Sequence, residues 1–93
     1  MTITHDADAR KFWAKGDNGE DMGVIEYTVS GNGDIYATHT EVPEQYEGQG
    51  IARQLLDALV VFAEGKNAKI VPICPYVIAA FKKHPDKYKN VIK

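Results

Sequence analysis

The hydrophobic period of this chain changes at a pair of glycines, and this change limits the folds that it can adopt. Residues 35–42 alternate with the period of a strand, whereas apolar residues from Ile51 to Phe62 recur at the spacing of one helical face. Gly48 and Gly50 lie between the two patterns in a polar turn. The helix start offers unpaired N–H groups and the positive end of its dipole. The sequence therefore predicts an anion-binding loop, with phosphate as the ligand.

The other elements follow from turn residues and β-branched runs on either side of this loop. Pro72 interrupts the last strand, which should lie at an edge or splay from its neighbour, and Gly65 is expected to cap the long helix. The order is β-β-β-α-β-α, an α/β (α+β) fold of about four strands in which a crossover helix lays the fourth strand parallel to the third. The expected strands are residues 10–15, 23–30, 35–42 and 69–74, and the expected helices are residues 50–64 and 76–83.

Length and composition indicate one small globular domain that spans residues 1–93. The chain has 93 residues, 44% apolar and 26% charged, which is ordinary for a single core. Its one cysteine excludes an intrachain disulfide and a zinc site built from cysteines, and its three histidines are too far apart for a spacing motif. We therefore expect no metal.

Hydropathy and charge exclude two further classes of partner. No apolar stretch approaches the roughly 20 residues needed to span a bilayer, and no signal peptide is visible, so we expect a cytoplasmic protein without a membrane partner. Lysines gather in residues 82–93, while the preceding residues are acidic. An acidic body disfavours nucleic acid, although the basic end could be a solvated tail or a contact for one small polyanion.

Three segments together resemble the GNAT N-acetyltransferase superfamily, in particular its smallest, single-domain branch of predicted acetyltransferases. The resemblance covers roughly residues 10–88. A Rossmann fingerprint would require a third glycine where Arg53 stands, and a P-loop would require Lys-Ser or Lys-Thr after the last glycine. The matching segments are Gln45-x-x-Gly48-x-Gly50, His39-Thr40-x-Val42-Pro43 and Pro72-x-Cys74-Pro75-Tyr76-Val77.

The resemblance implies a GNAT-like fold with splayed third and fourth strands, and transfer of an acetyl group from acetyl-CoA to an amine. The backbone of Val42 would pair with the pantetheine arm, and Lys82, Lys83 and His84 could reach the phosphates. Glu47 departs from the basic residue that many relatives carry there and would repel phosphate. The residues that would hold the pyrophosphate are Gly48, Gln49, Gly50, Ile51, Ala52 and Arg53.

Few side chains could carry the chemistry. Cys74 could act as a nucleophile or acid at the end of the fourth strand, or be a small buried hydrophobe. His39 is the corresponding base candidate, or a structural histidine. The alternation of its strand places His39 and Glu41 on one face with Ile35 and Ala37, so that His39 and Cys74 could face one another. Glu41 is the alternative base.

Tyr76 is a candidate for protonating the leaving thiolate, although tyrosines early in a helix often serve packing.

Other functions are compatible with the same residues. A noncatalytic acyl-CoA-binding or sensing module would keep the glycines without needing Cys74 or His39, and a small interaction domain would retain only the fold. The acceptor could be a small molecule or a protein-borne amine. The short chain leaves few residues to cover the acceptor site, so an open site that suits a bulky or protein-borne amine is expected.

Overall fold

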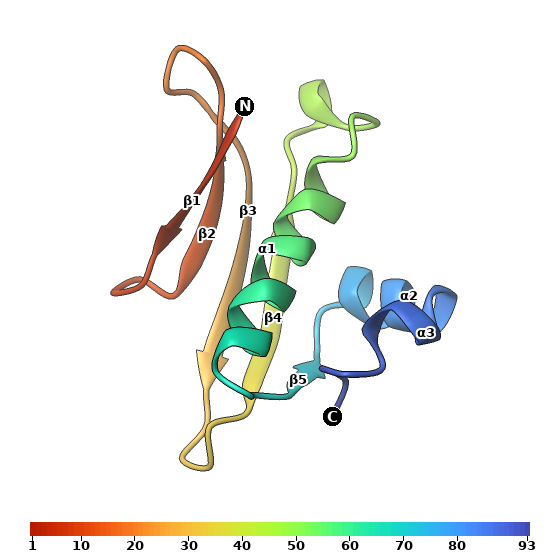
Figure 1. Cartoon of the computed structure of the whole chain (residues 1–93). Coiled ribbons are helices and arrows are strands. Elements are labelled where there is room, and N and C mark those ends of the chain that lie inside the picture. The colour runs from red at the N-terminus through yellow and green to blue at the C-terminus, as the bar shows by residue number, and fades with distance from the viewer.

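One five-stranded sheet organises the chain, in the order β1-β2-β3-β4-β5 (Figure 1). The computed structural model describes all 93 residues. Strands β1 to β4 are antiparallel neighbours, and β4 pairs with β5 in parallel. The strands are β1 (Thr2–Asp6), β2 (Lys11–Lys15), β3 (Asp21–Val29), β4 (Ile35–Glu41) and β5 (Ile70–Pro72). The helices are α1 (Ile51–Gly65), α2 (Pro75–Lys83) and α3 (Pro85–Tyr88), with a short 3₁₀ turn at Glu44–Tyr46.

The predicted α/β (α+β) class and the β-β-β-α-β-α order are confirmed for the middle of the chain. Strands β2, β3 and β4 correspond to the three predicted antiparallel strands, and α1 crosses over to the parallel strand β5. The structure adds β1 before this unit and α3 after it. The sheet therefore has five strands where the sequence predicts about four.

Strand β1 is missing from the prediction because its residues are mostly polar and exposed, with a histidine that packs against α1 from the edge of the sheet. The ring of His5 stacks on Phe12 at 4.0 Å between centroids and meets Phe62 edge-on at 4.7 Å. Its Nε2 lies 2.7 Å from the hydroxyl of Tyr27, which satisfies both polar groups. This largely exposed strand thereby packs against the aromatic end of the core.

The core lies on one face of the sheet, which α1 covers (Figure 1). Leu55, Leu56 and Leu59 of α1 are fully buried against inward-facing residues of the strands. Val24 is also buried, yet it lies outside this core cluster because it points to the opposite face of the sheet. That opposite face has no helix over it (Figure 1).

The left-handed residue that closes helix α1 is Asn67 and not a glycine. Gly65 is its last helical residue, and Asn67 adopts the left-handed conformation with φ of 53°. The N–H of Ala68 donates to the carbonyl of Ala63 at 2.9 Å, and the N–H of Asn67 donates to Glu64 at 3.1 Å. These two bonds form a Schellman motif with asparagine at the left-handed position. The predicted role of Gly65 is therefore wrong by two residues.

A β-bulge in β4 reverses the faces of its last residues. Glu26 pairs with His39, but Tyr27 pairs with Ala37, so Thr38 has no partner of its own on β3. The hydroxyl of Thr38 donates instead to the carbonyl of Glu26 at 3.3 Å. Beyond such an extra residue the alternation of side chains resumes with the opposite phase.

The predicted grouping of side chains on β4 is consequently wrong in part. Ile35 and Ala37 are buried under the helices, whereas His39 and Glu41 point to the uncovered face. Those two do share a face, as the alternation predicts. The side chain of Thr40 lies on the helix side, where the prediction placed His39.

Strands β4 and β5 separate after a short paired segment. Their pairing ends at Ala37 opposite Pro72, a residue with no N–H to donate. The carbonyl of Ala37 accepts from the N–H groups of both Ile73 and Cys74, at 3.1 and 2.9 Å, and the chain then turns into α2. The predicted splay is confirmed. The rest of β4 faces an opening instead of a strand.

The contact between Tyr27 and His5 generates a prediction about stability. Burial raises the pKa of Tyr27 above its ordinary value of 10.0, an effect that Arg10 opposes and Asp6 reinforces. The neutral phenol is therefore favoured in the folded state, and its contribution is present below pH 10 and lost as the pH rises through the folded pKa. Tyr27→Phe should lower the free energy of unfolding by about 1 kcal/mol at neutral pH and weaken its alkaline decline.

Urea unfolding between pH 7 and 11 measures both effects. Tyr36→Phe is the matched control, because the hydroxyl of Tyr36 makes no hydrogen bond within the protein. Equal losses in the two variants would contradict the assigned contact.

Candidate functional site

The loop between β4 and α1 holds its backbone open toward a ligand. After the 3₁₀ turn, Gly48 and Gly50 both adopt left-handed conformations, with φ of 81° and 76°. A side chain would be strained at either position. Gly50 is the N-cap of α1, and no side chain caps the helix. The predicted loop is thus confirmed as a strand-to-helix turn built on two glycines.

The backbone N–H groups from Gly48 to Arg53 donate to no acceptor in the protein. The first helical hydrogen bond is donated by Gln54, to the carbonyl of Gly50 at 3.1 Å. No acidic side chain occupies the first turn of α1. This run of free donors at the positive end of a helix dipole is suited to an anion with several oxygens.

Two cavities adjoin these donors on the helix side of the sheet. The first has a volume of about 220 Å³ and includes Val42, Glu47, Gly48 and Gly50 in its lining. The second has a volume of about 270 Å³ and extends toward the α2–α3 turn. Arg53 and Tyr76 line both. The two cavities are therefore neighbours, and together they define a path over the surface from the end of β4 to the C-terminal helices.

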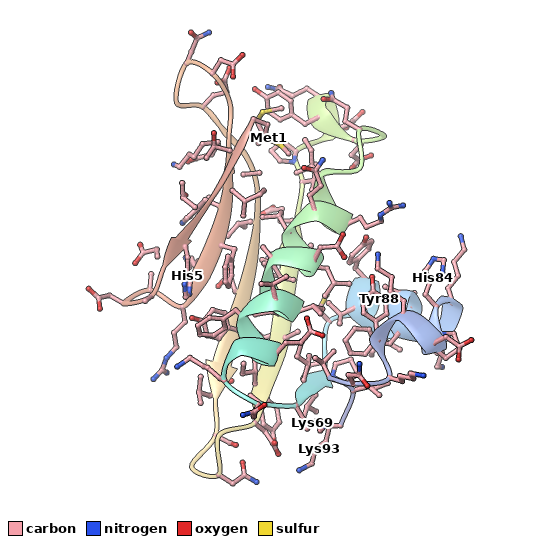
Figure 2. All side chains as sticks on the ribbon, viewed as in Figure 1. Met1, His5, Lys69, His84, Tyr88 and Lys93 are labelled. Carbon is pink, nitrogen blue, oxygen red and sulfur yellow. The ribbon has the colours of Figure 1, made fainter.

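The charges along this path are basic at the far end and acidic at the loop. Lys83 and His84 line the second cavity beside Arg53, whereas Lys82 does not line it. Figure 2 shows His84 where α2 meets α3, with Tyr88 nearby. Glu47 lines the first cavity. The predicted lysine pair is thus divided, since only one of its members lies at the site.

Cys74 lies on the helix side of the opening between β4 and β5. Its Sγ is 3.3 Å from the hydroxyl of Thr40, and the residue is 4% exposed. It also occupies the N-cap position of α2, which Pro75 begins. No histidine or carboxylate contacts the thiol. The predicted juxtaposition of Cys74 with His39 is wrong, because the bulge at Thr38 places Thr40 there instead.

His39 lies on the uncovered side of the same opening. Its side chain is 53% exposed, and its Nε2 is 3.8 Å from Oε2 of Glu41. The two base candidates therefore lie next to each other, on the opposite face of β4 from Cys74.

Tyr76 stands at the junction of the two cavities in the first turn of α2. Burial raises its pKa above the ordinary value of 10.0, and Tyr88 and Asp57 raise it further, while Arg53 and Lys87 lower it. The phenol is therefore protonated at neutral pH. It offers a neutral O–H donor at the site.

A protein-family comparison identifies the fold and its loop. Residues 11–91 match the model of a family described as GCN5-related N-acetyl-transferase. The chain belongs to this family. The match begins at β2 and includes the glycine loop, the splayed strands and both C-terminal helices. The predicted GNAT membership is confirmed.

Individual proteins resemble this GCN5-related chain over most of its length. Protein NATD1 of Homo sapiens is 31% identical over 85 residues, which is 91% of this chain and 75% of that protein. A GCN5-like protein of Staphylococcus aureus, known from its solution structure, superposes with a TM-score of 0.78 at 29% identity, over 99% of this chain and 87% of its own.

A larger relative shares the fold. The aminoglycoside N-acetyltransferase AAC(6')-Iy, solved in complex with CoA, superposes with a TM-score of 0.58 at 17% identity, over 82% of this chain and 63% of its own. This likeness shows the GNAT fold alone.

Sequence reasoning misses one residue of this GCN5-related site. Thr40 contacts Cys74, and no alternation of period two could have placed it there.

Two further findings concern the whole chain. None of its helices is both long and apolar enough to cross a bilayer. No cluster of three or more histidine, cysteine, aspartate or glutamate residues is arranged to hold a metal ion.

The free N–H groups predict that inorganic pyrophosphate binds the loop. Gly48→Ala forces a side chain into a left-handed conformation that costs about 1–2 kcal/mol, so pyrophosphate binding should weaken on the order of tenfold. Isothermal calorimetry measures this. Gly33→Ala is the matched control, because Gly33 has φ of 91° with equally open surroundings but lies in the distant β3–β4 turn. Equal affinity in the two variants would contradict a role for the loop.

Proposed function

We propose that this chain is an acetyl-CoA-dependent N-acetyltransferase that acts on a primary amine. The observation that carries the proposal is the run of free N–H groups from Gly48 to Arg53, which opens into a cavity beside the splayed strands. Family membership supports acetyl transfer in general. When bound, acetyl-CoA supplies the activated thioester. The chain supplies the groups that would hold the cofactor and protonate the leaving thiolate.

The residues on the helix side fit such a donor. The loop donors from Gly48 through Gln49, Gly50, Ile51 and Ala52 to Arg53 would bind the pyrophosphate. The unpaired edge of β4 near Val42 would hydrogen-bond the amide-containing pantetheine arm, and the side chains of Arg53 and Lys83 would meet the remaining phosphate. Glu47 is the one charge that opposes this fit.

The catalytic groups are divided between the two faces of one strand. His39, supported by Glu41, lies on the uncovered face and would accept the proton from the ammonium of the acceptor. Cys74 lies on the helix side, where its thiol is held by Thr40 and would protonate the departing thiolate. Tyr76 is a second donor on that side. The amine would therefore approach from one face while the sulfur leaves on the other.

Acetylation of n-butylamine, followed by mass spectrometry of the product, tests the catalytic assignments. His39→Ala should lower kcat by about 100-fold at neutral pH, with a smaller loss at high pH, where the amine deprotonates unaided. Cys74→Ser keeps the contact with Thr40 and should lower kcat less. Calorimetry with CoA is the control, since His39 lines neither cavity on the helix side. Unchanged turnover in both variants would contradict the assignments.

The division of the lysine pair gives a separate prediction about affinity. Lys83→Ala should weaken CoA binding about three- to fivefold at low salt, because one charge pair near the surface contributes up to about 1 kcal/mol. The difference should shrink above 0.5 M salt, where charges are screened. Lys82→Ala is the matched control, since that lysine lies outside the cavity. Equal effects of the two changes would contradict the assigned difference between the two lysines.

A noncatalytic acyl-CoA-binding module is the second candidate. The observation that favours it is the isolation of the Cys74 thiol, which contacts a hydroxyl and no base. Such a module would bind CoA through the same loop without turnover of any amine. Mass spectrometry of the protein after incubation with acetyl-CoA also separates a third outcome, in which Cys74 itself becomes acetylated and acts as the nucleophile.

A further inference from the structure

We propose that the uncovered face of the sheet binds the acceptor as a primary alkylammonium, with its stem on Trp13 and its charge at Glu41. The role of this site as an acceptor site rests on the proposed function, whereas amine binding to it can be tested without any acetyl transfer. A free alkylamine and a lysine side chain both consist of a short apolar stem that ends in one cation, so either could bind here.

A cavity of about 230 Å³ lies on this face, and no residue of the glycine loop or of a helix lines it. Its volume is below the roughly 300 Å³ of sites that hold drug-sized ligands. A single amine-bearing chain matches that size better than a multi-ring molecule does. The lining residues are Trp13, Asp21, Gly23, Val24, Glu41 and Pro43.

The position of this cavity suits an acceptor site. Glu41 lines it, and the next residue, Val42, lines the cavity at the glycine loop on the opposite face. The two cavities are therefore separated at the end of β4 by the thickness of one strand. Glu41 also contacts His39, the proposed base, at 3.8 Å. An ammonium at Glu41 would lie next to the group that takes its proton.

The charges on this face leave the Glu41 carboxylate without a lysine or arginine partner. Lys15 forms an ion pair with Asp21, and Lys11 stands opposite Glu26 in the sheet. The one charged neighbour of Glu41 is His39. Asp6 also stands opposite Lys11, so four carboxylates share this face with two lysines. The surplus negative charge favours a single cation.

The ring of Trp13 provides the apolar surface. The ammonium groups of Lys11 and Lys15 already lie 5.6 and 5.1 Å from its centroid, within the range of cation–π contacts, so the ligand's charge is directed to Glu41 instead. Val24 and Pro43 extend this surface toward Glu41. A methylene stem would lie on these side chains with its charge at the carboxylate.

Trp13 is the one tryptophan of the chain, so its fluorescence reports binding without any turnover. Titration with n-butylamine at pH 7.5, in the absence of CoA, should change the emission saturably. n-Butanol, with the same stem and no charge, should not. Glu41→Gln should weaken the response about tenfold, as loss of a charge-assisted hydrogen bond predicts. Glu44→Gln is the matched control, because Glu44 lines neither cavity.

A second arm compares n-butylamine with a peptide that contains one lysine. Tighter binding of the peptide supports a protein-borne source for the amine, and tighter binding of butylamine supports a small one. Equal responses to butylamine and butanol, or an unchanged response in Glu41→Gln, would overturn the proposal. Amine binding without any CoA binding would support this amine site and contradict the proposed transferase activity. Acetyl transfer without a fluorescence response would support the transferase activity and contradict this amine site.

Discussion

The carbonyl of Ala37 accepts hydrogen bonds from Ile73 and Cys74, and the shape of the site depends on this shared acceptor. It is the last link between β4 and β5, because Pro72 cannot donate and the chain turns away into α2. Every group on β4 beyond Ala37 consequently faces an opening. Without that opening the glycine loop would be an anion site beside a closed sheet.

The sequence predicts the elements better than it predicts the faces of their side chains. The loop glycines, the amphipathic helix and the parallel crossover follow from period and turn chemistry, and all are present. The bulge at Thr38 has no such signal, because it depends on how β3 pairs with β4. One extra residue therefore moved His39 to the opposite face from Cys74.

The prediction misses strand β1 for a related reason. His5 counts as polar in any pattern, yet in the structure it stacks on Phe12 and bonds to Tyr27. These contacts of an exposed side chain depend on partners distant in the chain. Likewise, Lys82 and Lys83 are neighbours in sequence but differ in position, because only the rotation of α2 decides which one reaches the cavity.

Gly23 connects the two faces in a further way. A β-carbon there would lie 3.1 Å from Ile51, 3.2 Å from Leu55 and 3.2 Å from Val42, so the absence of a side chain lets the end of β4 and the start of α1 approach the sheet closely. Gly23 also lines the cavity on the uncovered side. In the proposed transferase, this one backbone position would set the reach required of an amine. Substrate length would then depend on a residue that touches neither the thioester nor the proposed base.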